Sequence, residues 1–140
     1  ATDSTAERRS RVTGDSLFMA FREGAIDSVE VFGKAEGSYW EVARPDYVNR
    51  MNGDYMVLRF REREAREADV LGSARSTYYH FEQDTLKGRN RAQGRAINLA
   101  FARGRIEEVL VRGDASGVYE GRNLGTSRDT TRAAPTGEPQ

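Results

Sequence analysis

The residues that could do chemistry in this chain are few and isolated. The single histidine, His80, stands in Tyr79-His80-Phe81, where the two aromatic residues share one parity of an alternating pattern and His80 takes the other. A general base needs a partner and a pocket, and no Ser, Asp or Cys pattern beside His80 indicates a catalytic triad. We interpret His80 as an outward polar residue on a strand, and we predict no catalytic residues and no enzyme.

Metal and phosphate motifs are equally sparse. The chain has no cysteines, which excludes disulfides and thiolate metal sites. Asp15, Asp54 and Asp114 begin turns, where Asx turns explain them, and no carboxylates follow a metal-ligand spacing. Residues 88–94 read Gly-Arg-Asn-Arg-Ala-Gln-Gly, without the Lys-Ser/Thr of a phosphate-binding loop. We expect no metal and no cofactor.

Charge is abundant but balanced. The 140 residues carry 22 Lys or Arg and 22 Asp or Glu, so no global basic field points to nucleic acid. Most arginines have acidic neighbours, which favours a solvated face; the alternative is a cationic rim that meets phosphates on a lipid headgroup. No run approaches the roughly 18 apolar residues of a membrane helix. Residues 1–12 lack the apolar stretch of a signal peptide, so we expect none within the given chain. We expect no nucleic-acid partner and no membrane-spanning segment in this chain.

The elements that must position these residues form a repeat. With Gly14, Gly53 and Gly94 as position zero, the starts are 39 and 41 residues apart. The three copies agree at Met19/Leu58/Leu99, Phe21/Phe60/Phe101, Val31/Val70/Val111, Gly33/Gly72/Gly113, Ala35/Ala74/Ala115, Gly37/Ser76/Gly117 and Tyr39/Tyr78/Tyr119. A period of about 40 residues is typical of one supersecondary unit stacked on its neighbours.

Each unit predicts short antiparallel strands separated by glycine turns. Apolar residues alternate with polar ones, as in Ile97, Leu99 and Phe101, which favours an all-β fold with one buried face. Gly24 and Gly104 are predicted at hairpin tips with positive φ. Residues 60–70 also fit a charged helix, although the neighbouring copies favour a hairpin. We predict one domain over 13–121, a disordered lead or the end of a preceding strand over 1–12, and a disordered tail or linker over 122–140.

Small residues lie on the same parity as the large apolar ones, in the track Gly-x-Ala-x-Gly/Ser-x-Tyr. One interpretation is a close approach of two sheets, with glycine bulges bending the strands. The other is a groove left open between two sheets, wide enough for an acyl chain.

The stretch from Gly14 to Tyr39, Gly-Asp-Ser-Leu-x-x-x-Phe-x-x-Gly-x-Ile-x-x-Val-x-Val-x-Gly-x-Ala-x-Gly-x-Tyr, resembles the repeats of the OstA-like family. This family comprises the periplasmic lipopolysaccharide-transport proteins LptA and LptC and the N-terminal domain of LptD. The resemblance covers residues 12–121. It implies a β-jelly roll of the β-taco kind, in which two facing antiparallel sheets hold lipid acyl chains, and it implies modules that stack end to end through their edge strands. It also implies a periplasmic location.

The groove lining that the resemblance implies is the stripe of large apolar and aromatic residues at the repeated positions. The stripe consists of Leu17, Met19, Phe21, Val29, Val31, Tyr39, Met56, Leu58, Phe60, Val70, Tyr78, Ile97, Leu99, Phe101, Val109, Val111 and Tyr119. In the second copy Ala65 and Ala68 replace larger residues, which would widen the groove or remove this copy from it.

Two functions of different classes follow. The first is a lipid-binding transport module of outer-membrane biogenesis, with a lipopolysaccharide-like ligand and other jelly-roll modules, or copies of itself, as partners. The second is a self-assembling β-repeat scaffold or filament whose interior is closed by its own side chains. The interior distinguishes them, since a groove favours lipid and native packing density favours a scaffold.

Overall fold

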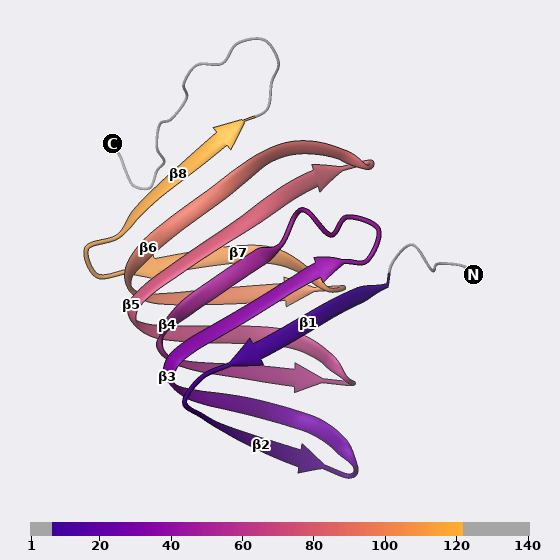
Figure 1. Ribbon diagram of the computed structural model, residues 1–140, viewed down its shortest axis with the longest axis vertical. Helices are drawn as coiled ribbons and strands as arrows, with labels where there is room; N and C mark the ends of the chain where they lie inside the picture. The colour runs from indigo at the N-terminus through magenta and orange to yellow at the C-terminus, as the bar shows by residue number, and fades with distance from the viewer. Residues whose placement is uncertain (1–6, 122–140) are drawn as a thin grey trace.

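The computed structural model describes residues 7–121, and within that range it contains strands and turns but no helix. Eight strands form one antiparallel sheet in the order β1-β3-β4-β5-β6-β7, with β2 also paired to β3 and β8 to β6 (Figure 1). Their bounds are β1 Arg8–Thr13, β2 Ser16–Arg22, β3 Ala25–Glu41, β4 Asn49–Arg61, β5 Glu64–Glu82, β6 Thr85–Ala102, β7 Arg105–Arg112 and β8 Ser116–Gly121. The prediction of an all-β fold is confirmed.

The sheet is bent across its middle into two arms. The first half of β3 pairs with β2 and its second half with β1, as in Val31↔Leu17 and Gly37↔Val12. On β6 the second half pairs with β7 and the first half with β8. We call residues 16–32, 55–71 and 96–112 the lower arm, and residues 8–13, 35–53, 74–94 and 116–121 the upper arm. Figure 1 shows the arms joined along one side and diverging on the other.

The bend follows from the backbone angles at three glycines. Gly33 and Lys34 both have positive φ, 81° and 51°, and the β3–β4 register shifts between Phe32 and Ala35. Gly72 with Ser73, and Gly113 with Asp114, have similar pairs of positive φ angles. A Cβ on Gly33 would collide with the carboxylate of Asp15, whose N–H donates to the Gly33 carbonyl at 2.8 Å. At Gly33 and Gly72 the pair therefore acts as a bulge that turns the strand, and at Gly113 it turns the chain between β7 and β8; glycine at the first position adopts this φ without strain.

This geometry corrects the prediction of short strands separated by glycine turns. Strands β3, β5 and β6 are 17, 19 and 18 residues long, and Gly33 and Gly72 lie inside them. The sequence pattern is the same for a turn and for a bulge, because both need a left-handed residue where the alternation pauses. Only the pairing on both sides of the glycine distinguishes a bend within a strand from the end of one.

The structure confirms the predicted hairpins. Gly24 and Gly104 lie at the β2–β3 and β6–β7 tips with φ of 80° and 76°, which confirms both. Residues 60–70 form the β4–β5 hairpin rather than a helix, with Glu62 and Arg63 at its tip in the left-handed region. The charges that suggested a helix instead pair across strands, as Arg59 does with Asp69 at 2.9 Å.

At the ends of the predicted domain, Arg8–Thr13 forms β1 and pairs with β3. The predicted tail over 122–140 lies outside the described residues.

The core lies between the arms, next to the bend. Large residues of the lower arm face small residues of the upper arm; a Cβ on Gly37 would lie 3.2 Å from Met56 Sδ. The buried set is Val29, Val31, Ala35, Met51, Met56, Ala68, Val70, Ala74, Ala92, Ile97, Leu99 and Phe101. We call this packed region the seam. Each alanine or glycine opposite a larger residue lets the backbones of the two arms approach closely. The narrow space between the arms is therefore densely packed.

Candidate binding groove

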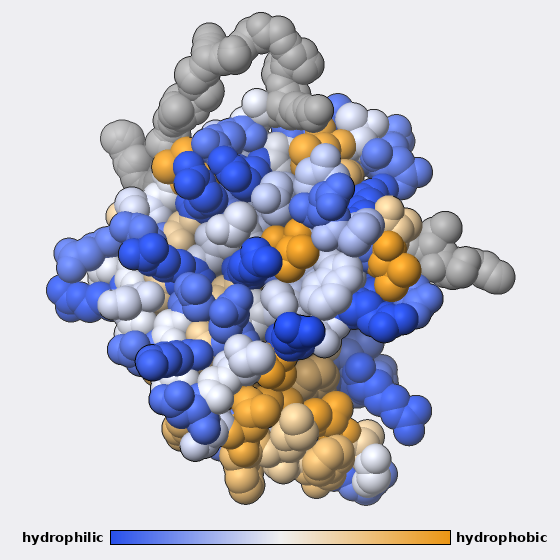
Figure 2. Space-filling model, in the orientation of Figure 1, coloured by the Kyte–Doolittle hydropathy of each residue, from blue (hydrophilic) through white to orange (hydrophobic). Residues whose placement is uncertain are grey.

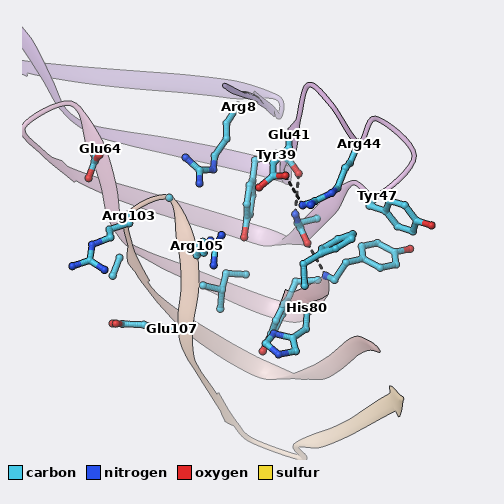
Figure 3. Close-up of a pocket in the computed structure, with 17 residues that line it drawn as sticks. Arg8, Tyr39, Glu41, Arg44, Tyr47, Glu64, His80, Arg103, Arg105 and Glu107 are labelled. Carbon is cyan, nitrogen blue, oxygen red and sulfur yellow. Dashed lines mark hydrogen bonds and ion pairs between the residues drawn. The ribbon is translucent and has the colours of Figure 1, made fainter. Parts of the chain in front are cut away.

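On the side away from the bend, the arms diverge around a pocket of about 800 Å³, which we call the mouth (Figure 3). The upper arm contributes the end of β3, the start of β4 and the end of β5. The lower arm contributes the β4–β5 tip at Glu64 and the β6–β7 hairpin from Ala102 to Glu107. Two hairpin tips of the lower arm, strand ends of the upper arm and the loop over 42–48 therefore build the mouth, whereas continuous strands build the seam.

A row of alternating tyrosine and asparagine crosses the upper arm at the level of the mouth. Tyr39 is the cross-strand neighbour of Asn49, and Asn90 lies between Tyr78 and Tyr119. The Asn49 side chain donates to the Tyr39 carbonyl at 3.3 Å and accepts the Tyr79 N–H at 2.7 Å. This row gives the upper arm a polar but uncharged inner surface.

The phenols of this row are held in the neutral form. Burial, and then the proximity of Tyr78, raises the pKa of Tyr39 far above its ordinary value. Burial, and then Tyr119, raises the pKa of Tyr78 in the same direction. Opposite them, the Tyr39 and Phe101 rings meet edge to face with centroids 5.9 Å apart. At the inner edge of the mouth, phenols of the upper arm therefore meet hydrocarbon of the lower arm. Further out, the lower arm lines the mouth mostly with charged side chains, namely Glu64, Arg103, Arg105 and Glu107.

The loop over 42–48 closes one side of the mouth. Arg44 donates to Glu41 and to Asp84, each at 2.6 Å, and its guanidinium lies 4.1 Å from the centre of the Phe81 ring. Tyr47 packs edge to face against Tyr79 and Phe81 at 5.2 and 5.4 Å. Arg44 is thus neutralised by two carboxylates and fixes the loop to the β5–β6 hairpin.

The predicted stripe divides into three environments. Seven members are buried in the seam or at its edge: Val29, Val31, Met56, Val70, Ile97, Leu99 and Phe101. Six are partly buried: Tyr39, Leu58, Phe60, Tyr78, Val109 and Val111. Four are exposed: Leu17 at 45%, Met19 at 46%, Phe21 at 63% and Tyr119 at 40%. The expectation that the whole stripe is buried on one surface is wrong for these four, because they lie on the edge strands β2 and β8.

In the first two copies the small-residue track is buried in the seam, where the interpretation of close sheet approach applies, whereas Ala115 and Gly117 of the third copy are exposed. Ala35, Gly37, Ala74 and Ser76 are all buried, and the hydroxyl of Ser76 has no hydrogen-bond partner in the described part of the chain. Met56, Val70 and Leu99 opposite are 0% exposed. Space for a ligand lies further out, at the mouth, where sequence reasoning placed Tyr39 and Tyr78 but missed Arg8, Arg44, Tyr47, Asn49 and Phe81.

The repeat contains a signal for Asn49 and Asn90. Ser10, Asn49 and Asn90 each stand four residues before the position-zero glycines, so the repeat extends further towards the N-terminus than its glycines indicate. These three positions face Tyr39, Tyr39 and Tyr78 respectively across the strands.

His80, which the alternation predicted to point outward, instead lines the mouth; its Nε2 lies 3.2 Å from Glu82 Oε2, and its side chain is 43% exposed. Over residues 7–121 there is no group of three or more His, Asp or Glu side chains placed to hold a metal ion. In the same range, no helix is long and apolar enough to cross a membrane.

No protein-family model matches this chain, and no curated protein matches it.

Proposed function

We propose that this chain is a lipid-binding transport module of the OstA-like kind. In this proposal it works in the periplasm during outer-membrane biogenesis and holds the acyl chains of a lipopolysaccharide-like lipid between its two arms. The observation that carries the proposal is the shape of the bent sheet, in which two inner faces meet in a packed seam and diverge into a pocket of about 800 Å³. That volume lies within the range of small-molecule sites.

The finer description of the fold belongs to the same proposal, namely a β-jelly roll of the β-taco kind built from three units of about 40 residues. Equivalent glycines support it. A Cβ added to Gly53 or Gly94 would lie 2.7 or 2.6 Å from a Cγ1 of Val70 or Val111, the valines at position +17 of their own units. Gly14 faces Val31 in the same way.

The energetics favour an acyl chain that enters at the mouth and follows the lower arm. Phe60, Phe101 and Ile106 continue the apolar face of the seam outward, and all three are only partly exposed or buried. Burial is worth about 0.8 kcal/mol per methylene, so a chain of about a dozen carbons gains on the order of 10 kcal/mol before ordering costs. Deeper entry would require the seam to open by separating the arms.

Assembly by edge-strand stacking completes the proposal. Figure 2 shows apolar surface gathered over the β2 end of the molecule. The exposed residues there are Leu17 and Met19 on the inner face of β2, Phe18 on its outer face, Phe21 beside the hairpin tip, and Phe32 of β3, which pairs with Ser16 at the start of β2. Strand β2 has no neighbour beyond it among the described strands, and an apolar edge invites strand addition. The edge strands β7 and β8 at the other end are the surfaces for the next module.

Photo-crosslinking tests the lipid proposal directly. A photoreactive side chain at Phe101, which is buried at the edge of the seam and contacts the mouth-lining Tyr39, is expected to give lipid adducts in cells that make lipopolysaccharide. The matched control is Tyr55, a partly buried aromatic residue on the outer face that donates to Glu30 at 2.6 Å. Adducts confined to the protein at both positions would count against lipid transport.

The second candidate, a scaffold with a closed core, is favoured by the side chains of the seam that are 0% exposed and by the two open edges. It predicts the same end-to-end association without lipid. Sedimentation of the full chain therefore tests stacking alone, and a strict monomer at high concentration would contradict stacking in both candidates.

A further inference from the structure

One side chain reaches from the upper arm to the lower across the mouth. Arg8 belongs to β1, yet a Cβ on Gly104, at the tip of the β6–β7 hairpin, would lie 2.8 Å from its Cζ and from Nη1. Figure 3 shows Arg8 extending from its strand into the space between the arms, towards the hairpin that carries Arg103 and Arg105. All three arginines line the mouth.

These three arginines have no carboxylate partner within the ion-pair distance of 4.0 Å in the part of the chain that the structure describes. Arg44, in the same pocket, is held by two carboxylates. Arg8 is also only partly exposed, since its guanidinium lies against Gly104 and close to the Tyr39 phenol. The positive charge of Arg8 acts to lower the pKa of that phenol, against the larger effect of burial. A guanidinium carries five N–H donors in a planar fork, and those of Arg8 face a pocket rather than an anion.

We propose that Arg8, together with Arg103 and Arg105, binds a phosphate-type oxyanion at the mouth. Guanidinium groups from opposite arms fit a tetrahedral dianion, which offers oxygens in several directions, better than a single planar carboxylate. As the headgroup phosphate of a bound lipid, this anion rests on the proposed function; as free phosphate it does not. The acyl chain would then lie deeper, beside Phe101.

Three acidic side chains line the mouth, and two of them oppose the anion without a cationic partner, since Glu41 is paired with Arg44. Glu64 and Glu107 also line the mouth, and neither has an arginine partner within ion-pair distance among residues 7–121. Their charge lowers the affinity for any anion held by Arg8 and the hairpin arginines. The site therefore predicts one substitution that strengthens binding, and a variant that has lost its fold cannot show a gain in affinity.

Calorimetric titration of the full chain with inorganic phosphate is the first test. Arg8→Gln and Arg105→Gln are each expected to weaken binding about tenfold, as for loss of a charge-assisted contact. Glu107→Gln is expected to tighten it about threefold. Arg22→Gln is the matched control, because it removes the same charge outside the mouth. Arg22 lies at the β2–β3 tip, and its side chain is 77% exposed. Equal losses for Arg22→Gln and Arg8→Gln, or no change with Arg8→Gln and Glu107→Gln, would overturn the proposal.

Vesicles separate the two sources of phosphate. Vesicles of phosphatidylcholine mixed with phosphatidic acid are compared with phosphatidylcholine alone. Preference for phosphatidic acid that falls with Arg8→Gln supports a lipid headgroup. Phosphate binding that depends on Arg8, without vesicle binding, keeps the anion site and counts against lipid transport. Equal binding of both vesicles, unaffected by Arg8→Gln, keeps the lipid and overturns the anion site.

Discussion

The seam and the mouth are made from the same strands and the same inner faces, yet they differ in almost every physical respect. The seam is apolar, packed to 0% exposure at Met56, Val70 and Leu99, and placed where bulges force the arms together. The mouth is amphipathic, lined by tyrosines, asparagines and arginines, and placed where the arms end in hairpins. The difference shows that one bent sheet can supply both a stabilising core and a ligand site, because the wedge between its arms widens with distance from the bend.

The largest test of this comparison is truncation inside and outside the seam. Leu99→Ala is expected to lower the free energy of unfolding by about 2–5 kcal/mol, because a fully buried leucine leaves a cavity. Leu17→Ala, at 45% exposure on β2, is expected to cost less than about 1 kcal/mol. Urea denaturation of both variants gives the two values. Similar small losses at both sites would mean that the arms stand apart in solution and that the seam is not a packed core.

Glycine substitution probes the close approach at the bend. A Cβ on Gly94 would lie 2.6 Å from Val111 Cγ1 and 3.0 Å from the Arg112 carbonyl, so Gly94→Ala is expected to cost about 1–3 kcal/mol. In edge strand β8, a Cβ on Gly117 finds only the Arg91 carbonyl, at 3.7 Å. Gly117→Ala is therefore expected to change stability by less than about 1 kcal/mol, in the stabilising direction. Thermal unfolding of the two variants side by side measures the contrast, and equal melting temperatures would contradict it.

At the mouth, the buried phenol of Tyr39 gives a pH dependence. Its pKa is raised above the ordinary value of 10.0 by burial, so its contribution to stability is complete below about pH 10. Above that pH the unfolded chain loses the proton while the folded chain keeps it, and the free energy of unfolding falls by up to about 1.4 kcal/mol per pH unit. In Tyr39→Phe this part of the alkaline decline should disappear. Denaturation curves on either side of pH 10 check it; parallel declines in both proteins would show that water reaches the phenol.

The same division explains how much the sequence could predict. The all-β fold, the hairpin tips at Gly24 and Gly104, and the buried core around Leu99 follow from alternation and from glycine, which are local signals. At Gly33 the sequence left both a turn and a strand-bending bulge open, because the chain alone does not say whether pairing continues past a left-handed residue; the structure has the bulge. Exposure of Leu17 was missed since it depends on β2 being an edge strand, which is a property of the whole sheet.

The mouth was the least predictable part because its residues come from positions far apart in the chain. Arg8 and Gly104 meet only once β1 and the β6–β7 hairpin face each other across the wedge. Arg44 and Asp84 are 40 residues apart, in a loop and at a hairpin tip that the repeat does not cover. The asparagine positions were visible in the repeat, but their place on the inner face was not.

The smallest expected effect measures the contact that joins the arms at the mouth. Gly24 and Gly104 both have positive φ at hairpin tips, so Gly24→Ala and Gly104→Ala share a backbone cost of about 1 kcal/mol. A Cβ at Gly24 meets nothing within 4 Å, whereas one at Gly104 meets the Arg8 guanidinium at 2.8 Å. Because that guanidinium is the end of a flexible side chain, the extra cost at Gly104 should be only about 0.5 kcal/mol, as for a weakly coupled pair. In an Arg8→Gln background the extra cost should vanish, and a double-mutant cycle by urea denaturation tests it. An excess at Gly104 that persists without Arg8 would place its cause in the hairpin itself and remove the evidence that β1 and the lower arm touch across the mouth.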